Sequence, residues 1–254
     1  MKQSVFMTVL MVVAFSISLV IYEYVFGAEG DPWGLEYIYK GGYLVVILMM
    51  LSIMVLTFVF ERFFSLRKSA GLEPLPNFTR KVQKNIQEGD IAAAIEICTV
   101  QKGACANILR MGLEGFQKGG SRNLSLYHRI SEARRAIEAA TVLEVPLLEK
   151  NLIALSTIAS IATMVGLLGT TIGMIRAFKA LAQAGAPDAV QLSLGISEAL
   201  INTAGGLFAA IVAIVAYNYF VNKVDTYTYF IEEATHNMLE TMENKYEMEE
   251  EKIS

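Results

Sequence analysis

Four long apolar stretches constrain this chain more than any other feature. Each contains roughly 20 mainly apolar residues, the length that an α-helix needs to cross a hydrocarbon core of about 30 Å. No convincing run of alternating apolar and polar residues predicts a strand. We therefore predict an all-α integral membrane protein with four transmembrane helices. The stretches are Val5 to Phe26, Gly42 to Phe64, Leu152 to Phe178 and Ala199 to Phe220.

The composition supports a membrane location. Of the 254 residues, 54% are hydrophobic and 18% are charged, and the mean hydropathy is +0.44. That balance is too apolar for a soluble domain of this length. The net charge of -4 offers no basic surface for phosphate backbones, so no nucleic-acid partner is expected.

The first stretch has two interpretations. Lys2 precedes it, and small residues near Ala28 offer a cleavage site, so a secretory signal is one interpretation. Its apolar run exceeds the usual signal core of about 7–15 residues. We expect a retained helix, with cleavage as the alternative.

Basic residues set the predicted orientation, because Lys and Arg accumulate on the cytoplasmic side of membrane helices. The loops Glu29 to Lys40 and Lys179 to Gln191 are short and poor in basic residues, as expected for the outer side. Both termini are then cytoplasmic. The basic residues that follow the second and fourth spans are Arg62, Arg67, Lys68, Arg80, Lys81, Lys84 and Lys223.

The spans divide the chain into five segments. Asp90 is a candidate N-cap for Ile91 to Val100. From Arg122 onward only Pro146 interrupts a helical pattern that runs into the third span, so we expect helices extending into a cytoplasmic bundle. The segments are an N-terminal span with a short outer loop (1–41), a second span (42–64), a cytoplasmic helical region (65–151), two spans joined by a short outer loop (152–220) and a cytoplasmic C-terminal helix (221–254).

No enzyme chemistry is indicated. Cys98 and Cys105 fall in the predicted cytoplasmic region and are interpreted as buried small hydrophobic residues. His128 and His236 lie in different segments without ligands at metal spacing, so no metal site or cofactor is predicted. No catalytic arrangement or phosphate loop is present, since Gly119 and Gly120 lack the context of a P-loop.

Small residues recur every three or four positions in the third and fourth spans. Such stripes let helices approach closely in lipid, so helix packing is the simplest interpretation of either stripe alone. The positions predicted to pack helices are Gly166, Gly173, Gly206 and Ala210.

Polar residues added to these stripes favour an ion pathway. A single threonine says little, because its hydroxyl often binds the carbonyl four residues earlier. Asn202 beside Thr203 is more informative, because an unpaired amide in hydrocarbon is costly. The candidate ion-pathway residues are Thr170, Thr171, Glu198, Asn202 and Thr203.

The centres of the third and fourth spans contain no Asp, Glu, His or Lys. Hydroxyls and amides do not titrate near neutral pH. If the protein conducts protons, the titrating carboxylate must therefore come from another chain. Glu23 and Glu61 lie at the ends of their spans and are interpreted as interfacial residues.

Two motifs resemble the ExbB/TolQ branch of the MotA/TolQ/ExbB family. Residues 166–174, GLLGTTIGM, are similar to its G-L-x-G-T-x-x-G-(I/M) signature, and residues 197–207, SEALINTAGGL, resemble E-A-L-x-x-T-A-x-G-L. Gly89 to Ile95, Leu109 to Leu113, and Tyr217 with Asn218 give supporting matches. The resemblance covers about Gly42 to Asp225.

The resemblance implies a bacterial inner-membrane motor subunit. It implies a homopentamer around a pore that holds the transmembrane helices of an ExbD/TolR-like partner, whose aspartate supplies the missing carboxylate. Thr170 and Thr203 match the pore-lining threonines of the family, and Glu198 matches its pore-mouth glutamate. Ion passage would then turn one oligomer inside the other and drive a TonB/TolA-like periplasmic protein.

The chain also departs from the family pattern. Two frequent prolines are absent, and the span before the usual three is extra. Thr171 and Asn202 are additional oxygen ligands, so a Na⁺-driven stator is an alternative to a proton channel. A membrane scaffold without conduction, whose stripes only pack helices, is the alternative from another functional class.

Overall fold

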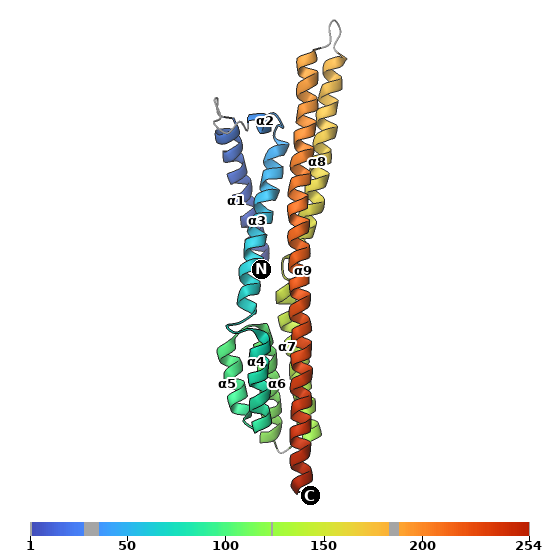
Figure 1. Cartoon of the computed structure of the whole chain (residues 1–254). Helices are drawn as coiled ribbons and strands as arrows, with labels where there is room; N and C mark the ends of the chain where they lie inside the picture. Colours follow the sequence, from blue (N-terminus) through green and yellow to red (C-terminus); the bar gives the residue numbers. More distant parts are fainter. Residues whose placement is uncertain (1, 28–35, 123, 183–187, 254) are drawn as a thin grey trace. The chain divides into compact units, whose positions relative to one another are not determined.

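The structure, a computed structural model, describes residues 2–27, 36–122, 124–182 and 188–253 (Figure 1). All regular elements in these ranges are helical, as predicted. Residues 29–35 and 183–187 of the two predicted outer loops lie outside the described residues, as does residue 28. The elements are α1 (Lys2–Ile21), the π-helical segment η1 (Tyr22–Phe26), α2 (Glu36–Tyr39), α3 (Leu44–Ser69), α4 (Leu75–Glu88), α5 (Ile91–Gln101), α6 (Ala104–Ser121), α7 (Leu126–Glu149), α8 (Leu152–Leu181) and α9 (Ala189–Ile253).

Four helical stretches are long and apolar enough to cross a membrane. This confirms the predicted class, an all-α membrane protein with four candidate spans. The stretches are Met7–Phe26, Leu44–Ser69, Leu126–Leu181 and Ala189–Met248.

The chain forms two compact units. Unit 1 consists of Met1–Glu61 and Asn151–Tyr219. Unit 2 consists of Arg62–Lys150 and Phe220–Ser254. Within unit 1, α8 runs beside the first part of α9, and within unit 2, α4, α5 and α6 lie side by side (Figure 1).

In unit 1, aromatic residues connect the end of the first span to the start of α3. The Tyr22 ring stacks on Tyr39 with a centroid distance of 4.7 Å, and its hydroxyl donates to the Tyr39 carbonyl over 3.1 Å. Tyr22 also packs with Val45 and Val46 in a buried apolar cluster. The first hydrophobic segment is thereby attached to the rest of unit 1.

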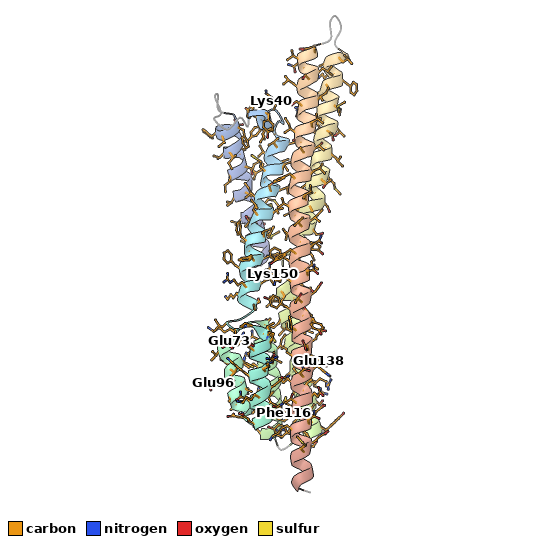
Figure 2. All side chains as sticks on the ribbon, viewed as in Figure 1. Lys40, Glu73, Glu96, Phe116, Glu138 and Lys150 are labelled. Atoms are coloured by element: carbon orange, nitrogen blue, oxygen red, sulfur yellow. The ribbon has the colours of Figure 1, made fainter. Side chains whose placement is uncertain are left out.

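Unit 2 is built from short helices with defined ends. Asp90 accepts a 2.8 Å hydrogen bond from the Ala93 amide, which confirms it as the N-cap of α5. Gly89 ends α4 in the left-handed conformation. In the core, the Arg129 guanidinium lies 4.0 Å from the ring centroid of Phe116 and 5.2 Å from that of Tyr246. Phe116 is labelled in Figure 2.

The connection into the third span differs from the expected interrupted helix. Pro146 lies inside α7, and the break comes at Lys150 and Asn151. Asn151 has a left-handed φ of 64°, which asparagine tolerates better than most residues. Near this point Arg62, only 1% exposed, donates to the Leu148 carbonyl over 3.2 Å. The chain is therefore held in place where α7 ends.

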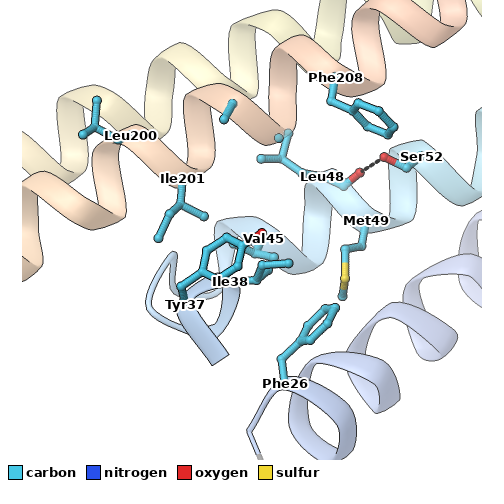
Figure 3. A pocket seen from close by; sticks show the side chains of 12 residues that line it. Phe26, Tyr37, Ile38, Val45, Leu48, Met49, Ser52, Leu200, Ile201 and Phe208 are labelled. Atoms are coloured by element: carbon cyan, nitrogen blue, oxygen red, sulfur yellow. Dashed lines mark hydrogen bonds between the residues drawn. The ribbon is translucent and has the colours of Figure 1, made fainter. Parts of the chain in front are cut away.

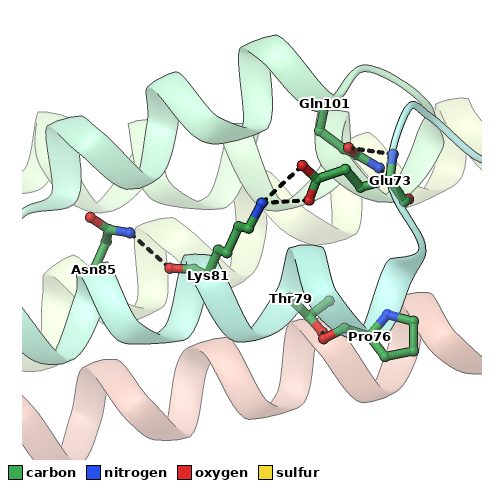
Figure 4. Close-up of polar contacts among 6 residues, drawn as sticks. All are labelled: Glu73, Pro76, Thr79, Lys81, Asn85 and Gln101. Atoms are coloured by element: carbon green, nitrogen blue, oxygen red, sulfur yellow. Dashed lines mark hydrogen bonds and ion pairs between the residues drawn. The ribbon is translucent and has the colours of Figure 1, made fainter.

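A paired amide joins the α3–α4 linker to the end of α5 (Figure 4). The Gln101 side chain accepts from the Glu73 amide over 3.0 Å and donates to the Glu73 carbonyl over 2.8 Å. The Leu72 amide donates to the Gln101 carbonyl over 3.1 Å. Three hydrogen bonds therefore fix the linker.

The two cysteines are buried and unbonded, as predicted for small hydrophobic residues. Burial raises the pKa of both Cys98 and Cys105 to about 12. A thiol with this pKa is ionised in about one molecule in 10,000 at pH 8, and the thiolate is the reactive form.

We expect iodoacetamide at pH 8 to leave both thiols of the folded chain unmodified and to alkylate both in denaturant, as measured by intact mass. A Val100→Cys variant provides the control, because position 100 on α5 is 62% exposed and should react in the folded state. Equal reaction rates at all three positions in the folded chain would contradict this prediction.

Candidate functional site

The two helices α8 and α9 of unit 1 meet along the predicted stripes of small residues. A Cβ added at Gly173 would lie 2.6 Å from the Gly195 carbonyl oxygen, and one added at Gly206 would lie 2.6 Å from the Ala162 carbonyl oxygen. One added at Gly166 would lie 3.2 Å from the Gly206 Cα. The helices therefore approach backbone to backbone. Ala210, one turn beyond Gly206, is also buried.

Two further glycines belong to this contact. A Cβ at Gly169 would clash with the Asn202 Cβ, and one at Gly195 would lie 2.7 Å from the Ala177 amide nitrogen. Sequence reasoning missed both positions. Gly169 stands three residues after Gly166, so a search for every small residue at helical spacing would have found it.

Asn202 is enclosed between helices and does not lie on an accessible face. Its side chain is fully buried, and Nδ2 donates to the Gly41 carbonyl over 2.8 Å and to the Glu198 carbonyl over 2.9 Å. The amide therefore faces the protein interior, one of the two environments expected for a polar group at this depth. Oδ1 is buried and has no hydrogen-bond partner among the described residues, which leaves one acceptor free at this depth.

The Thr203 hydroxyl lies at the contact between α8 and α9. Thr203 donates to the Ala199 carbonyl over 3.0 Å and lies 3.4 Å from the Gly166 carbonyl of the other helix. Thr170 stands one turn beyond Gly166 and is half-buried, while the neighbouring Thr171 is exposed. The hydroxyls of both α8 threonines donate to carbonyls of their own helix. Each threonine oxygen can still accept from another group.

Thr203 points away from α3. Ile201 packs against the apolar cluster that contains Val45, and a Cβ at Gly205 would meet Leu48 at 3.3 Å. Residues two apart on a helix are turned by about 200°. The face of α9 that carries Thr203 is therefore opposite the face that packs on α3.

Glu198 is held by an arginine that sequence reasoning missed. Arg176 Nη1 donates to both carboxylate oxygens of Glu198. The Glu198 side chain is 9% exposed and that of Arg176 is 61% exposed. Gly42 allows this arrangement, since it has a φ of +72° and a Cβ there would lie 2.9 Å from Glu198 Oε1.

A sequence signal for this pair exists. Arg176 is a single charge near the end of an otherwise apolar span, and Glu198 lies 22 residues later. Arg176 lies near the end of α8 and Glu198 near the start of α9. Two antiparallel helices joined by a short loop bring such positions near each other.

On the side of this ion pair away from the α8–α9 loop, the parts of α8 and α9 that belong to unit 1 carry no charged side chain. Residues 152–175 of α8 and 199–219 of α9 contain no Asp, Glu, His, Lys or Arg. Hydroxyls and amides can bind an ion or a water, but they cannot release a proton near neutral pH. The described residues contain no group of three or more His, Cys, Asp or Glu placed to hold a metal.

An apolar cavity of about 570 Å³ lies elsewhere in unit 1 (Figure 3). Phe26, Val45, Met49 and Phe208 are among the residues that line it. The Ser52 hydroxyl in its wall donates to the Leu48 carbonyl over 2.9 Å. An ion needs oxygen ligands or water, so these walls suit an ion less well than the contact between α8 and α9.

Comparison with known proteins identifies related sequences. The model of the MotA/TolQ/ExbB proton channel family matches residues 103–233. The Tol-Pal system protein TolQ of Haemophilus influenzae is 42% identical over 110 residues, which cover 42% of this chain and 48% of that protein. The match thus spans about half the length of that TolQ.

Two other relatives support the same grouping. The biopolymer transport protein ExbB-like 3 of Synechocystis is 30% identical over 183 residues, covering 71% of this chain and 81% of that protein. The biopolymer transport protein ExbB of Salmonella typhimurium is 42% identical over 73 residues, covering 29% of this chain and 30% of that protein.

Replacing Gly173 by alanine should separate α8 from α9, because the new methyl group meets backbone atoms that cannot move aside. We expect a loss of about 1–3 kcal/mol in stability, as in other overpacked contacts. Thermal unfolding of the detergent-solubilised chain measures it. Gly205→Ala is the matched control, since it adds the same helix propensity and its methyl group meets only the flexible Leu48 side chain. Equal melting temperatures for the two variants would contradict the contact.

The two halves of the ion pair should respond unequally to mutation. Arg176→Gln leaves a nearly buried carboxylate without its cation, whereas Glu198→Gln leaves an arginine that is largely in solvent. We expect Arg176→Gln to be more destabilising by roughly 1–3 kcal/mol, and the double variant to recover most of that loss. Similar melting temperatures for the two single variants would refute this asymmetry.

Proposed function

Since the chain belongs to the MotA/TolQ/ExbB proton channel family, we propose that it is the ion-conducting subunit of an inner-membrane motor. The motor couples the ion-motive force to work on a TonB/TolA-like periplasmic partner and so drives outer-membrane transport or maintenance. One observation carries this proposal: closely packed membrane helices bear half-buried threonine hydroxyls on the face opposite α3, with no titratable side chain at that depth.

Thr170 and Thr203 line the ion path in this proposal, and the exposed Thr171 extends it. Their oxygens supply acceptors for a water chain or an ion, and they hold no fixed charge. Asn202 lies beside them: its amide nitrogen binds the Gly41 carbonyl and so sets the position of Thr203, while its Oδ1 has no hydrogen-bond partner among the described residues and can accept. Glu198, paired with Arg176, marks the end of the path nearest the α8–α9 loop.

The proton-accepting group comes from a second protein. An ExbD/TolR-like subunit supplies a transmembrane aspartate beside the threonines, because this chain has no carboxylate there. Several copies of this chain, five as in the family, surround the partner. The chain itself performs no enzymatic reaction and needs no cofactor.

The protein spans the bacterial inner membrane several times, with both termini in the cytoplasm. Basic residues support this orientation: Arg67 and Lys68 end α3, and Lys223 follows the apolar part of α9. Segments 65–151 and 221–254 then form the cytoplasmic part, and the loops that contain residues 28–35 and 183–187 face the periplasm.

Ion flux into liposomes that contain this chain and its ExbD/TolR-like partner tests the proposal. Thr203→Ala should reduce partner-dependent flux at least about tenfold, as expected for loss of a positioned proton-relay group, while the complex still assembles. Thr203→Ser keeps the hydroxyl and should retain flux.

Thr157→Ala is the matched control, since it removes an exposed α8 hydroxyl that binds only the Ile153 carbonyl. Unchanged flux in Thr203→Ala would exclude this residue from the path. No flux from a well-assembled wild-type complex would favour the scaffold alternative.

The same assay identifies the ion. The unpartnered Oδ1 of Asn202 and the hydroxyl of Thr171 are oxygen ligands of the type that binds Na⁺. A proton path requires flux that follows the pH gradient without Na⁺. Flux that needs Na⁺ would instead identify a sodium-driven stator of the same family.

A further inference from the structure

A second pocket, in unit 2, lies where α3 ends, and the proposed ion path does not use it. The pocket has a volume of about 590 Å³. Arg67, Lys68 and Lys102 line it, against the single carboxylate of Glu144. That carboxylate already accepts a 3.0 Å hydrogen bond from Asn107. The walls of this α3 pocket are therefore positively charged.

The three cations are available to a ligand. All three side chains are exposed, and none of them forms an ion pair with another described residue. Five other cations of unit 2, Lys81, Lys84, Arg110, Arg134 and Arg135, pair with carboxylates. The α3 pocket therefore brings together three cations that form no such pair.

The backbone of Lys102 indicates that its side chain is needed there. Lys102 has a φ of 56° and a ψ of 177°, a conformation that glycine adopts far more easily than any other residue. Its neighbour Gly103 has a φ of +91°. The paired amides of Gln101 and Glu73 hold this turn against the α3–α4 linker (Figure 4). A lysine that lines the pocket therefore stands where glycine would be less strained.

The pocket lies at the end of a helix that is long and apolar enough to cross a membrane. It follows directly on the apolar part of α3, and Arg67 and Lys68 occupy the last turn of that helix. Two exposed apolar side chains, Phe64 and Leu72, line the same pocket. Basic side chains next to exposed apolar ones at the end of a membrane helix match a phosphate group that carries acyl chains.

We propose that the α3 pocket binds the headgroup of an anionic phospholipid. Arg67, Lys68 and Lys102 bind the phosphate, while Phe64 and Leu72 contact the start of the acyl chains. A free phosphate would use the three cations alone and would leave both apolar side chains unused. This inference does not depend on which ion the protein conducts or on its partner.

Native mass spectrometry of the full chain in detergent, titrated with phosphatidylglycerol or phosphatidylcholine, tests the proposal. The wild-type chain should bind phosphatidylglycerol more tightly than phosphatidylcholine. Each basic residue near a membrane surface strengthens the binding of anionic lipid about fivefold. Arg67→Gln/Lys68→Gln should therefore weaken phosphatidylglycerol binding about tenfold or more. The control, Lys84→Gln/Arg135→Gln, removes the same charge from exposed positions outside the pocket and should change binding less than about twofold.

Two further measurements separate the outcomes. Lys102→Gly should weaken phosphatidylglycerol binding about fivefold without lowering the melting temperature, because glycine relieves the backbone strain. Inorganic phosphate at matched ionic strength should not displace the lipid. Equal binding of both lipids by the wild-type chain, wild-type binding by Lys102→Gly, or full displacement by phosphate would each overturn the proposal.

Discussion

Gly173 and Gly195 bring the backbones of α8 and α9 so close that a methyl group on either residue would meet the other helix at 2.6 to 2.7 Å. Lipid tails provide no hydrophobic drive for two membrane helices to associate, so their association depends on such contact. The close approach also places the Thr203 hydroxyl 3.4 Å from a carbonyl of the other helix. Larger side chains along this contact would separate the helices and remove the threonine from that position.

The same contact explains why the charges lie at its end. A charged group in the tightly packed, apolar part would be buried without water, which is costly unless a partner is present. Glu198 and Arg176 meet this requirement by pairing with each other. Because the pair is neutral as a whole, it adds little fixed charge near the proposed path. A carboxylate supplied by another protein would then be the main titratable group that a passing ion meets.

Much of the fold could be predicted from the sequence, because the signals are local. Span length follows from apolar runs, and the Asp90 cap follows from one residue beside a helical pattern. The break before α8 was harder to place, since proline is the stronger helix breaker in general. Pro146 is nevertheless accommodated inside α7, and the break comes at Asn151. A proline near the end of a helix frees only one carbonyl, whereas a left-handed residue redirects the chain.

The candidate site was predicted less completely. Thr170 and Thr203 were identified from motifs, but burial decides what a polar side chain can do, and burial depends on neighbouring helices. Asn202 illustrates this limit, because its amide reaches the Gly41 carbonyl, 161 residues away in sequence. No pattern within one helix indicates such a partner. Arg176 was missed because only side chains that titrate near neutral pH were considered as ion-path groups, and arginine stays protonated at that pH.

The arginines and lysines of this chain serve two different purposes, and burial distinguishes them. Arg62 is enclosed and bound to the Leu148 carbonyl, and Arg129 lies over the Phe116 ring. Removing Arg62 would leave the Leu148 carbonyl without this donor, and removing Arg129 would lose the cation–π contact, so these residues maintain the fold. The side chains of Arg67 and Lys68 are exposed and form no hydrogen bond or ion pair with a buried group among the described residues. Their loss would alter what binds from outside and leave the packing intact. The position of these two exposed residues at the end of a membrane helix is therefore better explained by lipid binding than by a role in folding.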